Sequence, residues 1–288
     1  MELVVEGVHY PAHHFEGQYD IALGLLSDGV QVFKKVCNGS ASAWPFLAVN
    51  YSIQPEVHTH LKFLIPLGLA PGPHSPKDHN SFLHPFFCDM AKLAHGILTW
   101  NVLEQNKFLL RAFLITKIAD MQALKANQYL KGPNAFSPCR ACCIQGCRDP
   151  DHSGSNYYYP IHAPPGAIRL DHSPALDWDP ENLPLHTDEN YKKSLKYIQS
   201  GITKKECECC AKTESILVHL PGFSRVGSVP HEWMHLVMEN IEPTLVDLWT
   251  GRFKGLNEGT ETYVIPSHLW DLIGTETAAA MATIPTVF

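Results

Sequence analysis

Two aspartates in this sequence stand where apolar segments end, a position from which a carboxylate can reach a metal ion. Asp28 follows the apolar run Ile21–Leu26, and Asp120 is the last residue of the apolar segment Phe108–Asp120. Each also has a purely structural interpretation, because Asp28-Gly29 between apolar runs is typical of a hairpin turn and an aspartate before a helix is a common N-cap. If the two segments are neighbouring strands, both carboxylates and a third one from a helix could hold two divalent cations for phosphoryl transfer.

The segment "VPHEWMHLVMEN" (229–240) supplies the third carboxylate in this hypothesis. Glu239 lies four residues after His235, so a helix places both on one face, and Glu242 is the weaker candidate. The same segment contains His-Glu-x-x-His, in which His231 and His235 would bind zinc and Glu232 would be the general base of a metallopeptidase. Two features weaken the metallopeptidase hypothesis. The proline directly before the first histidine would start the helix at that ligand, and a third zinc ligand would have to come from a glycine-rich stretch.

The nine cysteines are clustered, which in a reducing compartment favours metal ligands or free thiols over disulfides. Cys139 and Cys142 form a Cys-x-x-Cys pair, and Cys147, His152 or His162 could complete four zinc ligands. A second group, without another well-spaced pair, consists of Cys207, Cys209 and Cys210. Structural zinc and reduced, partly buried thiols both fit this pattern.

Length and composition are those of an ordinary soluble globular protein of one or two domains. The 288 residues are 45% hydrophobic and 18% charged, and no apolar run approaches membrane-spanning length. The start, "MELVVEGVHYPAHHF", lacks the regions of a secretory signal, so we expect an intracellular protein, nuclear or cytoplasmic. A net charge of −7 argues against strong phosphate-backbone binding by this chain alone. The lysines expected on a solvated helix face are Lys192, Lys193, Lys196, Lys204 and Lys205.

Apolar spacing predicts an α/β fold whose sheet lies in the first half of the chain. The expected strands are Ile21–Leu26, Val30–Phe33, Trp44–Ile53, His60–Leu69 and Phe108–Asp120. The expected helices are Ser81–Leu103, Met121–Leu130, Glu189–Gln199 and Pro230–Trp249, the last one bent or interrupted by Pro243. We expect residues 1–135 to begin the core, 136–228 to form an irregular Cys- and Pro-rich insertion with a zinc site, and 229–288 to complete the core with helices.

Six motifs in this order resemble the CACTA (En/Spm-type) transposases. They are LSDGVQVF, SAWPFLAVNYSIQPEVH, LIPLGLAPGPHSPKDHNSFLHPF, LLRAFLITKIAD, FSPCRACC and PHEWMHLVMENIEPTLVDLWTG. The resemblance extends from about Leu25 to Ile273. It implies an RNase H-like core of the DDE/DDD class, which is a mixed sheet flanked by helices with a Cys-rich insertion before the last catalytic helix. It also implies that the protein cuts and joins DNA at transposon ends with Mg²⁺ or Mn²⁺.

The resemblance also assigns roles to individual residues. The implied catalytic acids and ligands of the divalent cations are Asp28, Asp120 and Glu239. Cys139 and Cys142 match the family's Cys-x-x-Cys, and His235 matches the histidine of its Met-His motif, so these three are candidates for zinc binding or a structural role.

The chain departs from the family in three ways. Relatives carry Pro-Ala shortly after the second acid, where this chain has Met121-Gln122-Ala123, and "ECECCAKT" (206–213) is an extra insertion. Relatives are also much longer, so we expect a truncated, transposon-derived fragment, whose activity and homo-oligomerisation stay open. The alternatives are a non-catalytic, zinc-stabilised remnant that binds DNA or a protein, and the zinc metallopeptidase.

Overall fold

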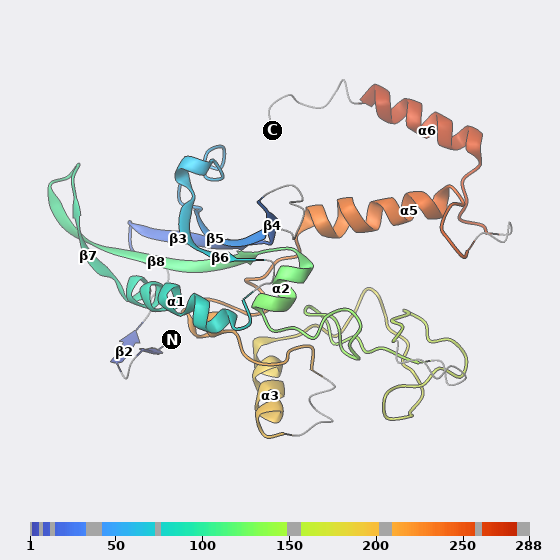
Figure 1. Ribbon diagram of the computed structural model, residues 1–288, viewed down its shortest axis with the longest axis horizontal. Helices are drawn as coiled ribbons and strands as arrows, with labels where there is room; N and C mark the ends of the chain where they lie inside the picture. Colours follow the sequence, from blue (N-terminus) through green and yellow to red (C-terminus); the bar gives the residue numbers. More distant parts are fainter. Residues whose placement is uncertain are drawn as a thin grey trace. The chain divides into compact units, whose positions relative to one another are not determined.

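The computed structural model describes residues 2–5, 8–11, 15–32, 42–72, 76–148, 157–201, 209–256 and 261–280. The chain divides into two units, Met1–Pro230 and His231–Phe288. The first unit contains a mixed sheet flanked by helices, and the described part of the second unit is helical (Figure 1).

The first unit contains the elements of both the sheet and the cysteine-rich region. Its strands are β1 (Glu2–Val5), β2 (Val8–Pro11), β3 (Asp20–Ser27), β4 (Val30–Gln31), β5 (Ser42–Asn50), β6 (Ile65–Pro71), β7 (Ile97–Asn101) and β8 (Asn106–Ile118). Its helices are η1 (Leu61–Phe63), α1 (His79–His95), α2 (Met121–Asn127), α3 (Asp188–Gln199) and η2 (Ile216–His219). The hairpin β1–β2 and the short helices η1 and η2 were not among the elements expected from apolar spacing.

The main sheet has the order β4-β5-β3-β8-β7, and β6 pairs with β5 as well. β5 is antiparallel to its three partners, β3 is parallel to β8, and β7 is antiparallel to β8. Three consecutive residues, Leu23 to Leu25, are buried in β3, as are Ala112 to Leu114 in β8. Such uninterrupted burial is typical of central strands that are covered on both faces.

β3 and β4 are two parts of one strand that pairs with β5 throughout. Ser27 at the end of β3 pairs with Phe46, and Val30 at the start of β4 pairs with Ala43. Both strands advance by three residues between these two pairs, so the register is the same on either side of the interruption. The chain therefore continues straight through residues 28–29, and the hairpin interpretation of this dipeptide is wrong.

Pro45 explains why the ladder is interrupted at this point. In the continued register Asp28 stands opposite Pro45, and Gly29 stands opposite Trp44. Proline has no N–H to donate to the ladder, so the regular pairing lapses beside it. A Cβ atom on Gly29 would lie 3.2 Å from the Trp44 ring, so glycine lets the strands keep their spacing here. The carboxylate of Asp28 thus stands on a strand of the sheet and not in a turn.

α1 lies along one face of the sheet and is shorter than expected (Figure 1). It begins after Asp78, whose side chain accepts a hydrogen bond from the Asn80 N–H, and it ends before Gly96, which has a φ of +115°. A Cβ atom at Gly96 would lie 2.6 Å from Leu109 of β8, so only glycine fits both the backbone angle and the space. The residues after Gly96, which we expected to extend the helix, form β7 instead.

One apolar core joins the sheet to α1, α2 and η2. Its most deeply buried members include Leu25, Phe46, Leu83, Met90, Leu114, Leu124 and Leu217. Each large apolar side chain buried in this way stabilises the fold by about 1.5–3 kcal/mol. α2 follows directly after β8, as the apolar pattern predicts, so the main core also fixes the position of the end of β8.

The segment between α2 and the second unit is mostly irregular. α3 is its longest helix, and a capping box between Thr187 and Asn190 defines its start. A second, smaller core packs Tyr191 and Leu195 of α3 against Cys209 and Cys210. Isolated bridges such as Cys142 with Leu185 provide most of the remaining pairing in the described residues.

The second unit contains η3 (Met234–Ile241), which is a π-helix, then α5 (Glu242–Trp249) and α6 (Ser267–Ala280). The expected helix from Pro230 to Trp249 therefore begins later than predicted. Pro243 lies in the first turn of α5, where its missing N–H is tolerated, and the wider π-helical turns precede it. Across the described residues of both units, no helix is long and apolar enough to cross a membrane.

Candidate functional site

Asp28 and Asp120 occupy equivalent positions at the ends of two neighbouring parallel strands. Leu26 of β3 pairs with Ile118 of β8, and each aspartate lies two residues beyond its member of this pair. Neighbouring strands lie about 4.8 Å apart, so the two main chains bring both carboxyl groups to the same edge of the sheet. Both residues are partly buried.

Each aspartate also has a structural role at this edge. Oδ1 of Asp120 accepts a hydrogen bond of 2.5 Å from the Ala123 N–H and caps α2. Oδ1 of Asp28 accepts one of 2.6 Å from the Gly29 N–H. The N-cap interpretation of Asp120 is therefore confirmed. It does not exclude metal binding, since a carboxylate has two oxygens and several lone pairs.

Buried polar side chains replace the apolar core next to the two aspartates. Ser27, Lys117, His79 and Asn127 are all buried, and the Asn127 amide donates a 3.2 Å hydrogen bond to the Ser27 hydroxyl. The ammonium of Lys117 lies 5.9 Å from the centre of the Phe46 ring and makes no hydrogen bond or ion pair with any described residue. Sequence analysis missed this cluster, although a lysine inside the apolar run "FLITKIAD" was a signal of it.

Burial changes the ionisation of two members of this cluster. Desolvation lowers the pKa of Lys117 from 10.5 to about 7. Desolvation and then the charge of Lys117 lower the pKa of His79 from 6.5 to about 4, so that its ring is neutral at pH 7. Buried polar groups that weaken a core are more often retained at functional sites than elsewhere.

In the second unit, Glu239 and His235 share one face of η3, as their four-residue spacing predicts. Nε2 of His235 lies 4.0 Å from Oε2 of Glu239, and Nδ1 lies 2.6 Å from Oε2 of Glu232. The structure therefore groups Glu239 with this histidine and with a second carboxylate.

The His-Glu-x-x-His segment does not have the geometry that a metallopeptidase helix requires. The helix begins at Met234, so His231 and Glu232 precede it and do not stand on its face. The carboxylate of Glu232 accepts hydrogen bonds from the N–H groups of Met234, at 3.0 Å, and of His235, at 2.7 Å. The bond from the His235 N–H is the main cause of a lowered pKa for Glu232, whereas a general base near neutral pH needs a raised one.

The Cys-x-x-Cys pair forms a turn in which backbone amides point at sulfur. Sγ of Cys139 accepts hydrogen bonds from the N–H groups of Ala141 and Cys142, both at 3.3 Å. Sγ of Cys143 lies 3.3 Å from Nδ1 of His186. His186 was not among the residues predicted from the sequence, because its separation of 43 positions from Cys143 leaves no spacing pattern to recognise.

Thiols from the second cysteine group lie close to this turn. The Tyr191 hydroxyl lies 2.8 Å from Sγ of Cys210 and donates a 2.9 Å hydrogen bond to the carbonyl of Arg140. Burial raises the pKa of Cys142 to about 11 and that of Cys210 to about 12, so both thiols are protonated at neutral pH without an added cation.

Two buried guanidinium groups accompany the thiols. Arg140 and Arg225 are both buried, and each has two side-chain nitrogens without a hydrogen-bond partner among the described residues. Neither makes an ion pair with a described carboxylate. Burial lowers the pKa of Arg140, and the neighbouring Cys139 and Cys210 oppose this shift. Negative charge on the sulfurs would therefore compensate a buried positive charge.

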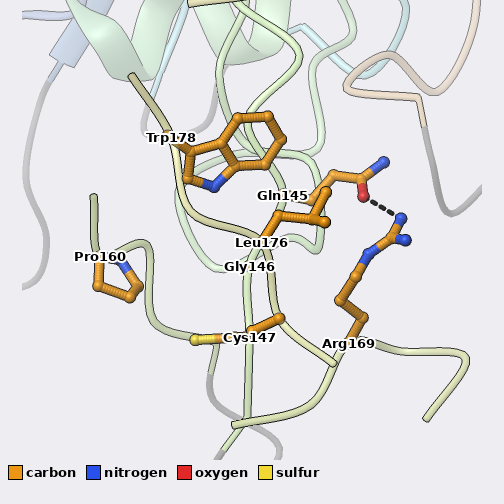
Figure 2. A pocket seen from close by; sticks show the side chains of 8 residues that line it. Gln145, Gly146, Cys147, Pro160, Arg169, Leu176 and Trp178 are labelled. Carbon is orange, nitrogen blue, oxygen red and sulfur yellow. Dashed lines mark hydrogen bonds between the residues drawn. The ribbon is translucent and has the colours of Figure 1, made fainter. Parts of the chain in front are cut away.

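Among the described residues, neither Cys147 nor His162, which the sequence also offered for zinc, belongs to a cluster that could hold a metal ion. Cys147 lines a small pocket in which Arg169 donates a hydrogen bond to Gln145 (Figure 2). The other lining residues are Gly146, Pro160, Ala175, Leu176 and Trp178, so no second cysteine, histidine or acid is among them. His162 is exposed, and both His152 and Cys207 lie outside the described residues.

In the described ranges, no three or more histidine, cysteine, aspartate or glutamate side chains are arranged so that they could hold a metal ion. The acid pair is limited to two candidate ligands in the first unit, Asp28 and Asp120. The cysteine turn supplies a close pair, Cys143 with His186, and further thiols around it.

Comparison with known proteins places these features in a family. Residues 8–163, which are more than half of the chain, match the family model described as "Transposase family tnp2". This range contains both Asp28 and Asp120 as well as the Cys-x-x-Cys turn. No curated protein matches the chain.

Proposed function

Because the chain belongs to the transposase family tnp2, we propose that its sheet is the catalytic core of a transposon-derived transposase that cuts and joins DNA. The observation that carries the proposal is the placement of Asp28 and Asp120 at equivalent positions on neighbouring parallel strands. The order of motifs further supports a CACTA-type enzyme. An enzyme that acts on transposon ends would work in the nucleus of a eukaryotic cell.

The strand arrangement supports an RNase H-like core. Three antiparallel segments, β3 with β4, β5 and β6, come first, then α1, and β8 returns parallel to β3 and beside it. The far side of β8 receives the segment after η2, since the Lys117 N–H donates a 2.7 Å hydrogen bond to the Ser228 carbonyl. The first and second acids thus come from strands that the fold must place side by side.

The donor chemistry of the acid pair fits Mg²⁺ or Mn²⁺. Carboxylate oxygens are the ligands that such hard cations prefer, and both carboxyl groups stand at one edge of the sheet. In the proposed enzyme Asp28 and Asp120 hold the cations, with Glu239 as the third carboxylate. When bound, the cations would activate the attacking oxygen and stabilise the leaving one.

The chain itself contributes rigidity to this site. Asp28 is held by a strand that pairs with β5 before and after it, and Asp120 is held by the first turn of α2. Neither carboxylate can move far without breaking main-chain hydrogen bonds. Positioning of this kind is what phosphoryl transfer requires of a protein.

A structural zinc site is proposed for the cysteine turn, and it also fits the second candidate function, a non-catalytic remnant that binds DNA or a protein. The supporting observation is the pair of N–H···S hydrogen bonds to Cys139, which fix this sulfur in the turn that also contains Cys142. Soft sulfur and imidazole donors suit zinc. Cys139 and Cys142 would be ligands, with Cys143 and His186 or a thiol of the second group completing the set.

DNA nicking in vitro tests the catalytic proposal. The chain is incubated with Mn²⁺ and a DNA duplex that carries the ends of its own element, and strand breaks are counted on a denaturing gel. We expect nicking that depends on Mn²⁺ and falls by about 10²–10³-fold or more in Asp28→Asn.

Asp89→Asn is the matched control, because Asp89 is exposed on α1 and makes only a 4.0 Å contact with Lys92. Nicking that survives in Asp28→Asn would contradict the proposal. Zinc bound through Cys139 and Cys142, together with no nicking by a folded wild-type chain, would favour the non-catalytic remnant.

A further inference from the structure

A cavity of about 490 Å³ is lined by residues of β5, of α2 and of the chain around the start of α1. Its lining residues are Trp44, Pro76, Lys77, His79, Gln122, Lys125, Ala126, Tyr129 and Lys212. The volume is in the range of small-ligand sites. Among the described residues, the cavity wall contains three lysines and no acid.

The lysines that line the cavity are not committed to other partners. Lys77, Lys125 and Lys212 make no ion pair with any described residue. Asp78 is the neighbouring acid, and its carboxylate accepts hydrogen bonds from the Ser81 and Tyr129 hydroxyls, which lower its pKa to about 2. The wall therefore presents positive charge to whatever enters the cavity.

Two aromatic rings of the wall are held in place by the fold. The Tyr129 hydroxyl donates to Oδ1 of Asp78 and accepts from the Asn80 N–H, both at 2.8 Å. The Trp44 ring is fixed between Gly29 and the edge of the buried His79 ring, whose centre lies 6.2 Å away. Fixed aromatic faces flanked by lysines are what proteins use to stack bases and bind phosphates of single-stranded nucleic acids.

Residues that neighbour both aspartates in the chain or across the sheet contribute to the cavity wall. Trp44 stands opposite Gly29, the residue after Asp28. α2, which Asp120 caps, contributes Gln122, Lys125 and Ala126 to the wall. The segments that position the two aspartates therefore also build part of the cavity wall.

We propose that the cavity takes one unpaired nucleotide of the DNA strand that is cut, with its base against Trp44 or Tyr129 and its phosphates near Lys125 and Lys212. The proposal rests on the proposed function, since it makes the cavity part of the same substrate site. It adds that the enzyme separates the strands near the cut, because a base paired in a duplex cannot enter the cavity.

Binding of a short, fluorescein-labelled single-stranded DNA to the full chain tests this proposal without catalysis. Fluorescence anisotropy is measured without added Mg²⁺ or Mn²⁺ over a range of salt concentrations. For Lys125→Gln with Lys212→Gln, loss of two phosphate contacts should flatten the slope of log K against log salt by about 1.4, which is roughly 25-fold in affinity at about 0.1 M salt. Lys193→Gln with Lys196→Gln, which removes the same charge from the exposed face of α3, should change neither value.

Stacking is tested separately from charge. Trp44→Leu should weaken binding by about 5- to 100-fold, whereas Trp44→Phe keeps an aromatic face and should retain most of the affinity. Circular dichroism and the thermal midpoint show whether each variant is folded. Equal losses in Leu and Phe variants that remain folded would count against stacking and overturn the proposal.

Competition with unlabelled ligands identifies the source of the phosphate. A deoxynucleoside monophosphate that displaces the oligonucleotide at comparable concentrations would make the cavity a site for free nucleotides and overturn the proposal. Lysine-dependent binding of the oligonucleotide without any Mn²⁺-dependent nicking would support the cavity and contradict the proposed function. Nicking that depends on Asp28 but is unchanged by the lysine and Trp44 variants would support the proposed function and contradict the proposal for the cavity.

Discussion

The acidic edge of the sheet and the cysteine turn are both candidate metal sites, but different forces position them. Asp28 and Asp120 are placed by regular pairing between β3 and β8, which exists whether or not a cation is bound. The cysteines and His186 lie in irregular chain joined by isolated bridges. The first arrangement is therefore a consequence of the fold, whereas the proposed zinc would help to hold the second region together.

The two regions also differ in their buried polar groups that have no hydrogen-bond partner among the described residues. Near the acids, the buried Lys117 is the main electrostatic defect, and a large apolar core surrounds it. Around the cysteines, several N–H groups of Arg140 and Arg225 have no hydrogen-bond partner among the described residues, and the local core is small. Removal of a bound metal ion should therefore destabilise the cysteine region far more than the sheet.

The largest expected effect is the loss of zinc from the cysteine region. Cys139→Ser with Cys142→Ser should reduce bound zinc from about one ion per chain to a trace and lower the free energy of unfolding by about 5 kcal/mol or more. Metal analysis and denaturant unfolding measure both quantities. Cys88→Ser, a partly exposed thiol on α1, is the control. A double variant as stable as the wild type would remove the distinction between the two regions.

The next effect concerns the buried lysine beside the acids. Lys117→Met keeps the side-chain length and removes the charge, so it should raise the free energy of unfolding by about 1–4 kcal/mol at pH 6. Between pH 7 and 10.5 the unfolded wild type binds more protons than the folded one, so wild-type stability should rise with pH through this window. The advantage of the variant should shrink accordingly.

Chemical unfolding at several pH values measures this difference. Lys107→Met, on an exposed part of β8, is the control and should show no such pH dependence. A variant less stable than the wild type at pH 6 would show that Lys117 has a compensating partner. If the variant gains stability and loses nicking, Lys117 is required for nicking although it lowers the free energy of unfolding.

A smaller effect separates the two roles of Asp120. Asp120→Ala removes the cap of α2 and should cost about 1 kcal/mol, while Asp120→Asn retains a good cap and should cost little. Both variants should lose nicking, because both lose the charge. Thermal unfolding and the nicking assay are run in parallel. An active Asp120→Asn would leave Asp120 with its structural role alone.

The smallest effect is expected on the exposed face of α3. Lys193 lies 3.1 Å from Glu189 one turn earlier, and both side chains are largely exposed. Lys193→Ala should lower the free energy of unfolding by about 0.5 kcal/mol or less, and added salt should reduce the difference. A loss above about 1 kcal/mol would mean that surface charge, and not metal and the small core, stabilises the cysteine region.

The sequence by itself determined the local elements that carry the acids. The apolar runs before Asp28 and Asp120 are strands, α2 begins at Asp120, and α3 follows the predicted range to within one residue. These features depend on periodicity and capping, which act over a few residues. Motif order was likewise sufficient to indicate a transposase by resemblance, and the family match confirms that coarser statement.

Only the tertiary structure decided how those elements meet. The local sequence predicts a turn at Asp28-Gly29, but the register with Pro45 and Trp44 of β5 keeps this dipeptide in line with the strand. α1 ends before Gly96, where a positive φ and the closeness of Leu109 of β8 leave space for glycine alone.

Tertiary structure likewise brings Cys143 close to His186, and it brings Lys125 and Lys212 to the wall of one cavity. Contacts between residues far apart in the chain leave no periodic signal in a single sequence. They exist only once the core has brought the segments together.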